Sequence, residues 1–393
     1  MSEELDKVAN RVFKRAETIS TSFEENLKAL ESPTDLITNY TKDDLISTGS
    51  TLLNLACSGM WEGGYYLGSE VHLLGDSGVG KTISALSVMA EAVIDTRFDK
   101  YGLKDVELEA AMHFNLEEIF GPQITRVEII PDEEHKGLYT TVNWENDHKK
   151  WLKEGPHIII TDSWDALMLP DDLVIKKVKE SDSDDEDSEE NEEKEKKSGK
   201  GGWKTGKAIL ASEGLRKIIY QAGKTKSLIM ILSQTRQNLK MGFGQPARTS
   251  SGGDALKFYA THEVWLYFGK QITTEVRKKK RRIGVHVHAS VEKNKLTGKR
   301  RRVTFPVYDA YGIDDLQSMI DWMIEEKFWG SEKGRINTEG DLGVAKNYYD
   351  RDLIKYIEDE NKENEFRQII GQCWNDLENE IMEGINLRKP RYR

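Results

Sequence analysis

The segment Val71-His-Leu-Leu-Gly-Asp-Ser-Gly-Val-Gly-Lys-Thr82 decides the fold of this 393-residue chain. From Gly75 onward it has a glycine, four residues, a second glycine, a lysine and a threonine, which is the pattern of a phosphate-binding loop, or P-loop. The apolar run before Gly75 predicts a buried strand, and the apolar spacing in residues 83–94 predicts an amphipathic helix. Because the motif requires a strand, a loop and a helix in this order, we expect a nucleotide-binding α/β fold.

The residue types in this loop suit a phosphate group and a metal ion. Glycines let the backbone curl, so that successive N–H groups and the positive end of the following helix face an anion. Lys81 supplies a point charge for the β- and γ-phosphates, and Thr82 supplies a hydroxyl group for Mg²⁺. We therefore predict that the nucleotide contacts the whole loop, namely Gly75, Asp76, Ser77, Gly78, Val79, Gly80, Lys81 and Thr82.

A second apolar run ends in a carboxylate. Residues 157–161 read as a buried strand, and Asp162 follows directly. An aspartate at the end of a strand is often only a turn residue. Beside a P-loop, however, such a carboxylate suits Mg²⁺ or the water molecules around it, so we predict that Thr82 and Asp162 hold the metal ion.

The net charge of −11 comes almost entirely from one segment. Residues 180–195 contain eleven acidic residues and one lysine, a charge of −10, so the other 377 residues carry only −1. A run of like charges without aromatic residues cannot bury a core, so we expect a disordered acidic insertion at about residues 178–200. The overall composition, with 37% hydrophobic residues, excludes a collagen-like or fully disordered chain.

The cysteines and the N-terminus bear on the cellular compartment. Cys57 and Cys373 are far apart, and no Cys or His stands near either at metal-ligand spacing, so we expect neither a disulfide framework nor a zinc site. The first residues are acidic, and no apolar run approaches the length of a membrane span of about 18 residues. We therefore expect a soluble, cytoplasmic protein without a membrane partner.

The order of patterns along the chain predicts three parts. Residues 1–46 read as an N-terminal helical oligomerisation segment, and residues 47–320 alternate short apolar runs with helix-length segments, as in a parallel sheet flanked by helices. Within that core, residues 263–305 read as β-rich, with a hairpin at residues 277–282. Residues 321–393 read as a small, charged helical domain.

The chain resembles the RecA family of recombinases at four places in the same order. These are Ser47-Thr-Gly-Ser-Thr-Leu-Leu-Asn-Leu-Ala-Cys-Ser-Gly59 with Gly63-Gly64, then Ser233-Gln-Thr-Arg236, then Phe243-Gly-Gln-Pro246 with Gly252-Gly-Asp-Ala-Leu-Lys-Phe-Tyr-Ala260, and finally Glu292-Lys-Asn-Lys-Leu296. The matches cover about residues 45–320, while the C-terminal part matches weakly. The resemblance implies a divergent member with a RecA-like P-loop ATPase core: a mostly parallel, twisted sheet flanked by helices, with an N-terminal helix and a small α-rich C-terminal domain.

The resemblance also implies residues for ATP hydrolysis. The family's general base, a glutamate that orients the attacking water, falls on Glu109 when counted back from Gly121. Glu107 is the alternative, and both carboxylates could simply face solvent at a strand end. Gln234 is the family's sensor of the γ-phosphate. The aromatic side chain on which the family stacks adenine is not evident, because Leu116 stands at the matching position.

Lys293 and Lys295 match a further motif of the family. They alternate on a predicted strand, so their ammonium groups point to the same face. On an edge strand, two lysines could serve only to keep the strand from pairing with other molecules. The resemblance implies instead that they reach the γ-phosphate of the neighbouring subunit and neutralise charge in the transition state, as an arginine finger does.

Two segments are expected to contact DNA. The stretch from Arg236 to Asp254, with Lys240, Phe243 and Arg248, resembles the family's second DNA-binding loop, although its composition alone predicts only a flexible loop. Trp203 and Lys204, in the basic flank of the acidic insertion, have the stacking aromatic and the charge that suit single-stranded DNA. The insertion itself either competes with DNA for these basic loops or is an inert solubilising segment.

The sequence thus predicts a DNA-dependent ATPase that uses ATP and Mg²⁺. We expect it to polymerise on single-stranded DNA as a homo-oligomeric filament with ATP at the subunit interfaces, and to catalyse homologous pairing and strand exchange with double-stranded DNA. Two alternatives remain: a hexameric helicase built on the same core, and a DNA-binding protein that uses ATP for assembly and hydrolyses it weakly.

Overall fold

The computed structural model describes seven stretches of the chain: residues 40–109, 115–131, 139–169, 202–237, 248–250, 253–344 and 347–384, with the backbone alone at 202–213, 236–237, 248–250 and 253–255. Residues 1–39 of the predicted N-terminal segment and the acidic insertion lie outside the described residues. Lys240 and Phe243 lie outside them as well.

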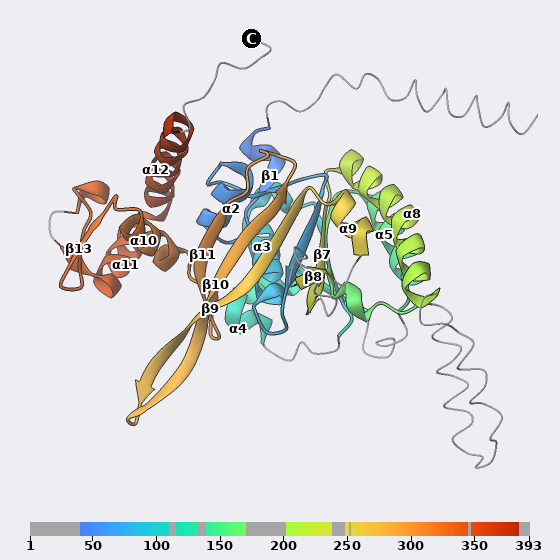
Figure 1. The fold of residues 1–393 in the computed structure, drawn as a ribbon, viewed down its shortest axis with the longest axis horizontal. Coiled ribbons are helices and arrows are strands. Elements are labelled where there is room, and N and C mark those ends of the chain that lie inside the picture. Colours follow the sequence, from blue (N-terminus) through green and yellow to red (C-terminus); the bar gives the residue numbers. More distant parts are fainter. Residues whose placement is uncertain are drawn as a thin grey trace, which may run out of the picture. The chain divides into compact units, whose positions relative to one another are not determined.

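One sheet of ten strands forms the centre of the chain (Figure 1). Its strands are β3 (Glu70–Gly75), β4 (Gly102–Glu107), β5 (Glu128–Ile130), β6 (His157–Asp162), β7 (Leu228–Gln237), β8 (Arg248–Ser250), β9 (His262–Val276), β10 (Lys279–Asn294), β11 (Arg302–Tyr308) and β12 (Gly312–Ile313). They follow the order β12-β11-β10-β9-β3-β7-β6-β4-β5, with β8 paired to β7. The pairs from β9 through β3 to β5 are parallel, and those from β9 to β12 are antiparallel. The structure confirms the predicted fold class.

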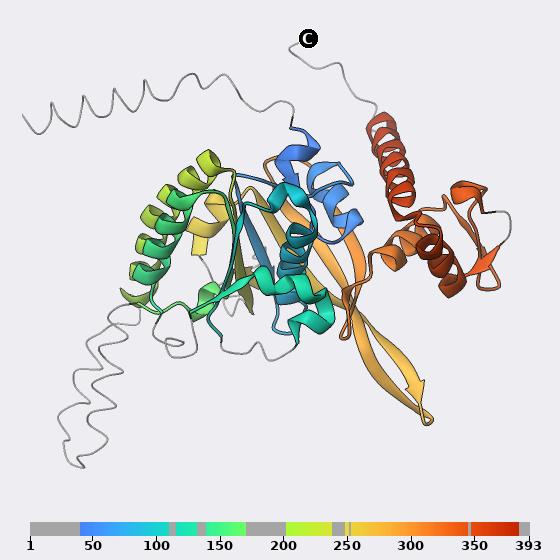
Figure 2. The same cartoon turned by 180° about the vertical axis from the view of Figure 1, so that it is seen from behind.

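Helices cover both faces of the parallel strands. These are α2 (Thr51–Ser58), α3 (Lys81–Ile94), α5 (Thr141–Glu154), α8 (Gly202–Thr225) and α9 (Gly253–Tyr259). In β6, Ile158 and Ile160 pack in the same cluster as the apolar side chains of α2 and α3, whereas Ile159 packs in a second cluster with side chains of α5, α8 and α9. Successive side chains of a strand point to opposite faces, so a continuous apolar run is needed to fill both layers. Figure 2 shows the α3 layer from behind.

The β9–β10 hairpin is longer than the strands beside it. Its turn lies at Arg277 and Lys278, both with positive φ (54° and 59°), which confirms the hairpin predicted at residues 277–282. β11 pairs only as far as Gly284 and β3 only as far as Leu266, so the distal half has no third strand beside it. Both figures show it projecting from the sheet as a two-stranded ribbon.

Two predicted boundaries differ from the structure. The compact unit begins at Lys42, because β1 (Leu45–Ile46) pairs with β2 (Tyr65–Tyr66) and is buried within the core. The boundary at residue 320 falls inside α10 (Asp315–Glu325). The carboxylate of Asp315 accepts hydrogen bonds from the backbone N and the Oγ1 of Thr51, both at 2.7 Å, so the start of α10 is held against α2.

The C-terminal part contains strands that the sequence did not predict. Besides α11 (Asp350–Asp359) and α12 (Glu363–Gly384) it has a three-stranded antiparallel sheet, formed by β13 (Gly330–Glu332), β14 (Arg335–Asn337) and β15 (Tyr348–Tyr349). The turn between the first two strands consists of Lys333 and Gly334, both with positive φ. A two-residue turn of this kind matches the twist of a hairpin. The helices α10, α11 and α12 are therefore accompanied by a small sheet that the sequence did not predict.

A partly buried ion cluster ties α12 to the connection between β10 and β11. The carboxylate of Glu378 accepts a hydrogen bond from Nη2 of Arg301 at 2.7 Å and lies 3.0 Å from Nζ of Lys299. The hydrogen bond from Arg301 holds the pKa of Glu378 below its ordinary value.

A search of the described stretches for a helix with the length and hydropathy of a membrane span found none.

We expect the Glu378→Gln variant to unfold more easily at neutral pH, by about 1–2 kcal/mol, because two cations lose their partner. A carboxylate whose pKa is lowered by folding stabilises the protein above its unfolded-state pKa, and this contribution disappears as the pH falls through the folded-state value. Urea titrations at neutral and strongly acidic pH should therefore show a difference only at neutral pH. Glu332→Gln, which alters an ion pair on the exposed hairpin turn, is the control and should leave stability unchanged.

Candidate nucleotide-binding site

The P-loop follows the most central strand of the sheet. β3 lies between β7 and β9, and its last residue, Gly75, pairs with Gln234 on one side and Leu266 on the other. A Cβ atom at Gly75 would lie 2.6 Å from Cγ1 of Val79 and 2.9 Å from the carbonyl oxygen of Leu266, so only glycine fits. Gly80, with φ of 97°, takes the left-handed conformation directly before α3 begins at Lys81. The backbone N–H groups at the start of α3 thus stand at the carboxyl edge of the sheet, where they can bind an anion.

The side chains predicted for the metal ion meet directly. Oγ1 of Thr82 donates a hydrogen bond of 2.5 Å to Oδ2 of Asp162 at the end of β6. Burial raises the pKa of Asp162 to about 6, while the hydrogen bond from Thr82 lowers it. A hydroxyl group and a carboxylate are hard oxygen ligands, which fit Mg²⁺ bound mainly to water and phosphate oxygens. No group of three His, Cys, Asp or Glu side chains in the described stretches could hold a metal ion alone, and a Mg²⁺–nucleotide site does not require one.

Lys81 lies over the loop that it belongs to. Its Nζ donates hydrogen bonds to the carbonyl oxygens of Gly75 and Asp76, both at 3.0 Å. Burial lowers the pKa of this ammonium group, and the carboxylates around it, of which Asp162 and Glu109 have the largest effect, oppose that change. The charge is therefore held where the β- and γ-phosphates of a nucleotide in this loop would lie.

Glu109 and Gln234 are brought together, although they are 125 residues apart. Nε2 of Gln234 donates a hydrogen bond of 3.2 Å to Oε1 of Glu109, and Oγ of Ser163 donates to the same oxygen. Glu109 is exposed, whereas Glu107 is buried at the end of β4, where it pairs in register with Asp162. Of the two glutamates that the sequence left open, Glu109 is the one that solvent can reach.

Three further contacts at this edge were not predicted. Besides Ser163, they involve Asp165, which accepts a hydrogen bond of 2.9 Å from the backbone N of Gln234, and Thr235, whose Oγ1 donates to Oδ1 of Asp76. Ser163 and Asp165 follow the carboxyl end of β6, Asp76 follows that of β3, and Thr235 lies in the C-terminal part of β7. Their positions after apolar runs were the available signal, since the carboxyl ends of parallel strands meet at one edge.

Lys293 and Lys295 lie away from this edge. Lys293 is opposite Glu263 in the β9–β10 pairing, and Glu263 is opposite His72 in the β3–β9 pairing. His72 lies three residues, or about 10 Å, before Gly75 along β3. Nζ of Lys293 donates to the carbonyl oxygen of Phe258 at 3.0 Å and to that of Lys257, and Nζ of Lys295 donates to Phe258 at 3.0 Å and Tyr259 at 3.2 Å. β10 ends at Asn294, so Lys295 lies just beyond the strand, yet both ammonium groups reach the C-terminal end of α9.

The predicted DNA-binding residues that the structure includes lie on three elements. Trp203 and Lys204 are near the start of α8, Arg236 is in β7, and Arg248 is in β8. β7 and β8 pair antiparallel, with Gln237 opposite Arg248, so both ends of the predicted second DNA-binding loop leave the sheet together, next to Gln234.

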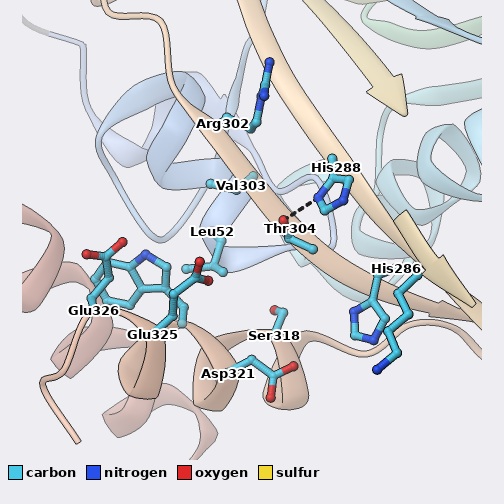
Figure 3. Close-up of a pocket in the computed structure, with 12 residues that line it drawn as sticks. Leu52, His286, His288, Arg302, Val303, Thr304, Ser318, Asp321, Glu325 and Glu326 are labelled. Carbon is cyan, nitrogen blue, oxygen red and sulfur yellow. Dashed lines mark hydrogen bonds between the residues drawn. The ribbon is translucent and has the colours of Figure 1, made fainter. Parts of the chain in front are cut away.

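A separate cleft of about 500 Å³ lies between the outer strands and α10 (Figure 3). His286 and His288 of β10 stand on one wall, with His288 Nδ1 hydrogen-bonded to Oγ1 of Thr304 at 2.8 Å, and Asp321 stands on the opposite wall. Its lining comprises Leu52, Lys270, His286, His288, Arg302, Val303, Thr304, Ser318, Asp321, Trp322, Glu325 and Glu326. No P-loop residue contributes, so this cleft is distinct from the nucleotide site.

Comparisons with known proteins agree with this geometry. Residues 193–314 match the RecA N-terminal domain. The chain is 25% identical over 370 residues to a protein RecA of Streptococcus agalactiae serotype III, a match that covers 87% of this chain and 86% of that protein. The chain is thus similar to RecA proteins at low identity over most of its length.

Other RecA relatives are matched over less of their length. The mitochondrial DNA repair protein recA homolog 3 of Arabidopsis thaliana is 27% identical over 79% of this chain and 63% of its own length. A protein RecA of Treponema denticola is 24% identical over 80% of this chain and 66% of its own length. The chain thus spans slightly less than two thirds of these two proteins. The segment that matches the RecA domain contains α8, β7 with Gln234, and both Lys293 and Lys295.

We expect the Thr82→Val variant to lower Mg²⁺-dependent nucleotide affinity by about tenfold or more, because valine keeps the shape of the side chain and removes the hydroxyl group. Calorimetric titration with ADP, with Mg²⁺ and with a chelator, would measure this. Ser87→Ala is the control, since the Ser87 hydroxyl donates a hydrogen bond within its own helix, to the carbonyl oxygen of Ile83. Equal Mg²⁺ dependence in the Thr82→Val variant and the parent would contradict the metal role of Thr82.

Proposed function

We propose that this chain is a DNA-dependent ATPase that assembles on single-stranded DNA with ATP and Mg²⁺ and catalyses homologous pairing and strand exchange in recombination and repair. The hydrogen bond between Gln234 and Glu109 carries this proposal, because it joins the predicted catalytic carboxylate to the strand from which the predicted DNA-binding loop departs. The similarity to RecA proteins supports it.

In this proposal the P-loop holds the triphosphate of ATP. Lys81 neutralises charge on the β- and γ-phosphates, and the N–H groups at the start of α3 bind their oxygens. Thr82 and Asp162 would hold Mg²⁺, which supplies further positive charge to the phosphates. Glu109 then accepts a proton from a water molecule in line with the γ-phosphate, a role that its exposure and its position beside Lys81 permit.

Gln234 gives the site a way to respond to DNA. Its amide contacts Glu109, its backbone N contacts Asp165, and two residues later the chain enters the β7–β8 pairing. A γ-phosphate that drew the amide away from Glu109 would shift the end of β7, and DNA bound to the loop would favour the same shifted position. By linkage, ATP and DNA then favour each other's binding.

Lys293 and Lys295 supply the proposed contact between subunits. Their ammonium groups gather at the end of α9 next to Phe258, whose side chain is 70% exposed. An exposed aromatic side chain beside two cations suits an interface that closes over the phosphates of another subunit. ATP would then both bind and join the subunits of a filament.

We expect single-stranded DNA to stimulate ATP turnover, and the Glu109→Gln variant to lose about 100-fold or more of that turnover while still binding ATP. Glu107→Gln is the matched comparison and should retain most of the activity. Steady-state phosphate release with and without DNA measures both. Wild-type turnover in Glu109→Gln together with loss in Glu107→Gln would transfer the role to Glu107, and absence of stimulation by DNA would favour a protein that uses ATP only for assembly.

Electron microscopy of the chain with ATP and single-stranded DNA should reveal helical filaments. We expect Lys293→Ala and Lys295→Ala to shorten the filaments and lower turnover, while the nucleotide affinity of isolated subunits is unchanged, since neither lysine contacts the P-loop of its own chain in the described stretches. Closed rings would instead support the helicase interpretation.

A further inference from the structure

A buried carboxyl group lies beneath Lys293 and Lys295. The side chain of Glu70, at the start of β3, is 0% exposed, and neither of its carboxyl oxygens has a hydrogen-bond partner among the described residues. Glu263 on β9 is 2% exposed and uses one oxygen to accept a hydrogen bond of 2.7 Å from Nε1 of Trp265. Two carboxyl groups in an apolar layer are unfavourable to folding unless charge nearby compensates them.

Strand register places these groups on one face of the sheet. Glu263 is opposite His72 in the β3–β9 pairing and opposite Lys293 in the β9–β10 pairing. Side chains two residues apart on a strand share a face, so Glu70 lies on the same side as His72. The backbone N of Thr261 donates to the carbonyl oxygen of Glu70 at 2.8 Å, and that of Lys295 donates to Thr261 at 2.9 Å, so Lys295 is tied to Glu70 through one residue.

The short helix α9 covers this face and leaves the lysines at its edge. Leu256 of α9 packs in one cluster with Ile229 of β7, the residue beside Glu70 in the β3–β7 register. The C-terminal carbonyl groups of α9 carry partial negative charge and accept the hydrogen bonds from Lys293 and Lys295. The lysines therefore stand between two sources of negative potential, the end of α9 and the carboxyl groups below it.

The charges of this cluster depend on one another. Burial raises the pKa of Glu70 well above its ordinary value, Lys295 and Lys293 oppose that change, and Glu263 adds to it. Burial likewise lowers the pKa of Lys293, and Glu263 and Glu70 oppose it. The other titratable groups here are His72, whose pKa burial lowers to about 3, and Lys257 and Tyr259 of α9, while β7 contributes the apolar Ile229.

We propose that Glu70 is a positioning residue for Lys293 and Lys295: as a carboxylate it holds both ammonium groups at the end of α9, and as a neutral acid it lets them turn to an anion on an adjacent subunit. This inference rests on the proposed function of the two lysines. The release takes up one proton at the carboxyl group of Glu70 from solvent. Subunit assembly is therefore favoured as the pH falls through the range in which Glu70 titrates.

The first test measures the lysines without reference to function. Acetylation of the full chain by an N-hydroxysuccinimide ester, in the absence of nucleotide, is followed by mass spectrometry at Lys293 and Lys295 from about pH 6 to about pH 9. Only the neutral amine reacts. The rates of the parent and of Glu70→Gln should coincide at low pH and diverge as the pH rises, with Glu70→Gln faster by about threefold, equivalent to half a pKa unit.

Two further variants keep this test decisive. Glu70→Leu removes the acid without leaving an amide in an apolar layer, and it should react like Glu70→Gln even if the amide destabilises the fold. Glu91→Gln is the matched control, because Glu91 on α3 is another carboxyl group whose pKa burial raises, away from both lysines. Parallel curves for the parent and both Glu70 variants would overturn the inference, as would an equal change in Glu91→Gln.

The second test separates this inference from the proposed function. In the DNA-dependent ATPase assay, the parent's apparent KM for ATP should fall as the pH is lowered, and Glu70→Gln should show the parent's low-pH KM at every pH with an unchanged kcat. If acetylation responds to Glu70 but Lys293→Ala leaves the ATPase intact, the proposed role of the lysines across an interface fails, while their control by Glu70 stands. A KM that depends on pH in the same way in both proteins would overturn the inference.

Discussion

The parallel pairing of β3 with β7 on one side and β9 on the other is the interaction on which the rest of the structure depends. It sets Gly75 opposite both Gln234 and Leu266, so the P-loop, the amide of Gln234 and the carboxylate of Asp162 all meet at the same edge of the sheet. Side chains alternate along a strand, so a slip of one residue would turn the buried residues of β3 to the wrong layers and leave no room for the loop. The absence of a Cβ at Gly75 is what permits this register.

Buried carboxyl groups dominate the electrostatics of that edge. Asp105 and Glu107 lie on β4, the strand that pairs with β6, which ends at Asp162. Burial raises the pKa of Asp105 to about 8, and the charges of Asp162 and Glu107 add to this rise. Such a cluster disfavours further negative charge and attracts cations. Lys81 neutralises part of this negative potential, and a Mg²⁺ ion bound with the nucleotide would add positive charge at the same place. The negative phosphates are therefore acceptable only together with their metal ion, which gives a physical reason for the metal dependence expected of Thr82.

The sequence predicted the parts of the site that are governed by local pattern. The P-loop, the strand ending at Asp162 and the hairpin at residues 277–282 each depend on neighbouring residues, and the structure has them where the sequence places them. Individual contacts between distant segments were not predicted. The apolar runs indicate that the strand ends meet at one edge, but not that Asp165 accepts a hydrogen bond from Gln234 or that Ser163 donates one to Glu109. Glu70 was missed for a related reason. It comes directly before an apolar run and reads as a polar residue at the start of a strand, and only the register with β9 and β10 places it under the lysines. The strands around Lys333 were missed because each is too short to show the alternation of apolar and polar residues that indicates a strand.

The strand order also determines when the site can form during synthesis. β3 pairs with β9 across about 190 residues, Val71 with His262, and β10, which pairs with β9, follows only after the hairpin turn. Long-range pairings of this kind make folding slow. The long connection between β6 and β7 adds little to the entropic cost of closing the chain, because that cost grows only with the logarithm of the loop length. A ribosome must therefore release most of the core before β3 is enclosed on both sides. The P-loop can therefore take its nucleotide-binding conformation only after β9 has been synthesised. A product truncated before β9 would contain the complete P-loop sequence without the fold that shapes it.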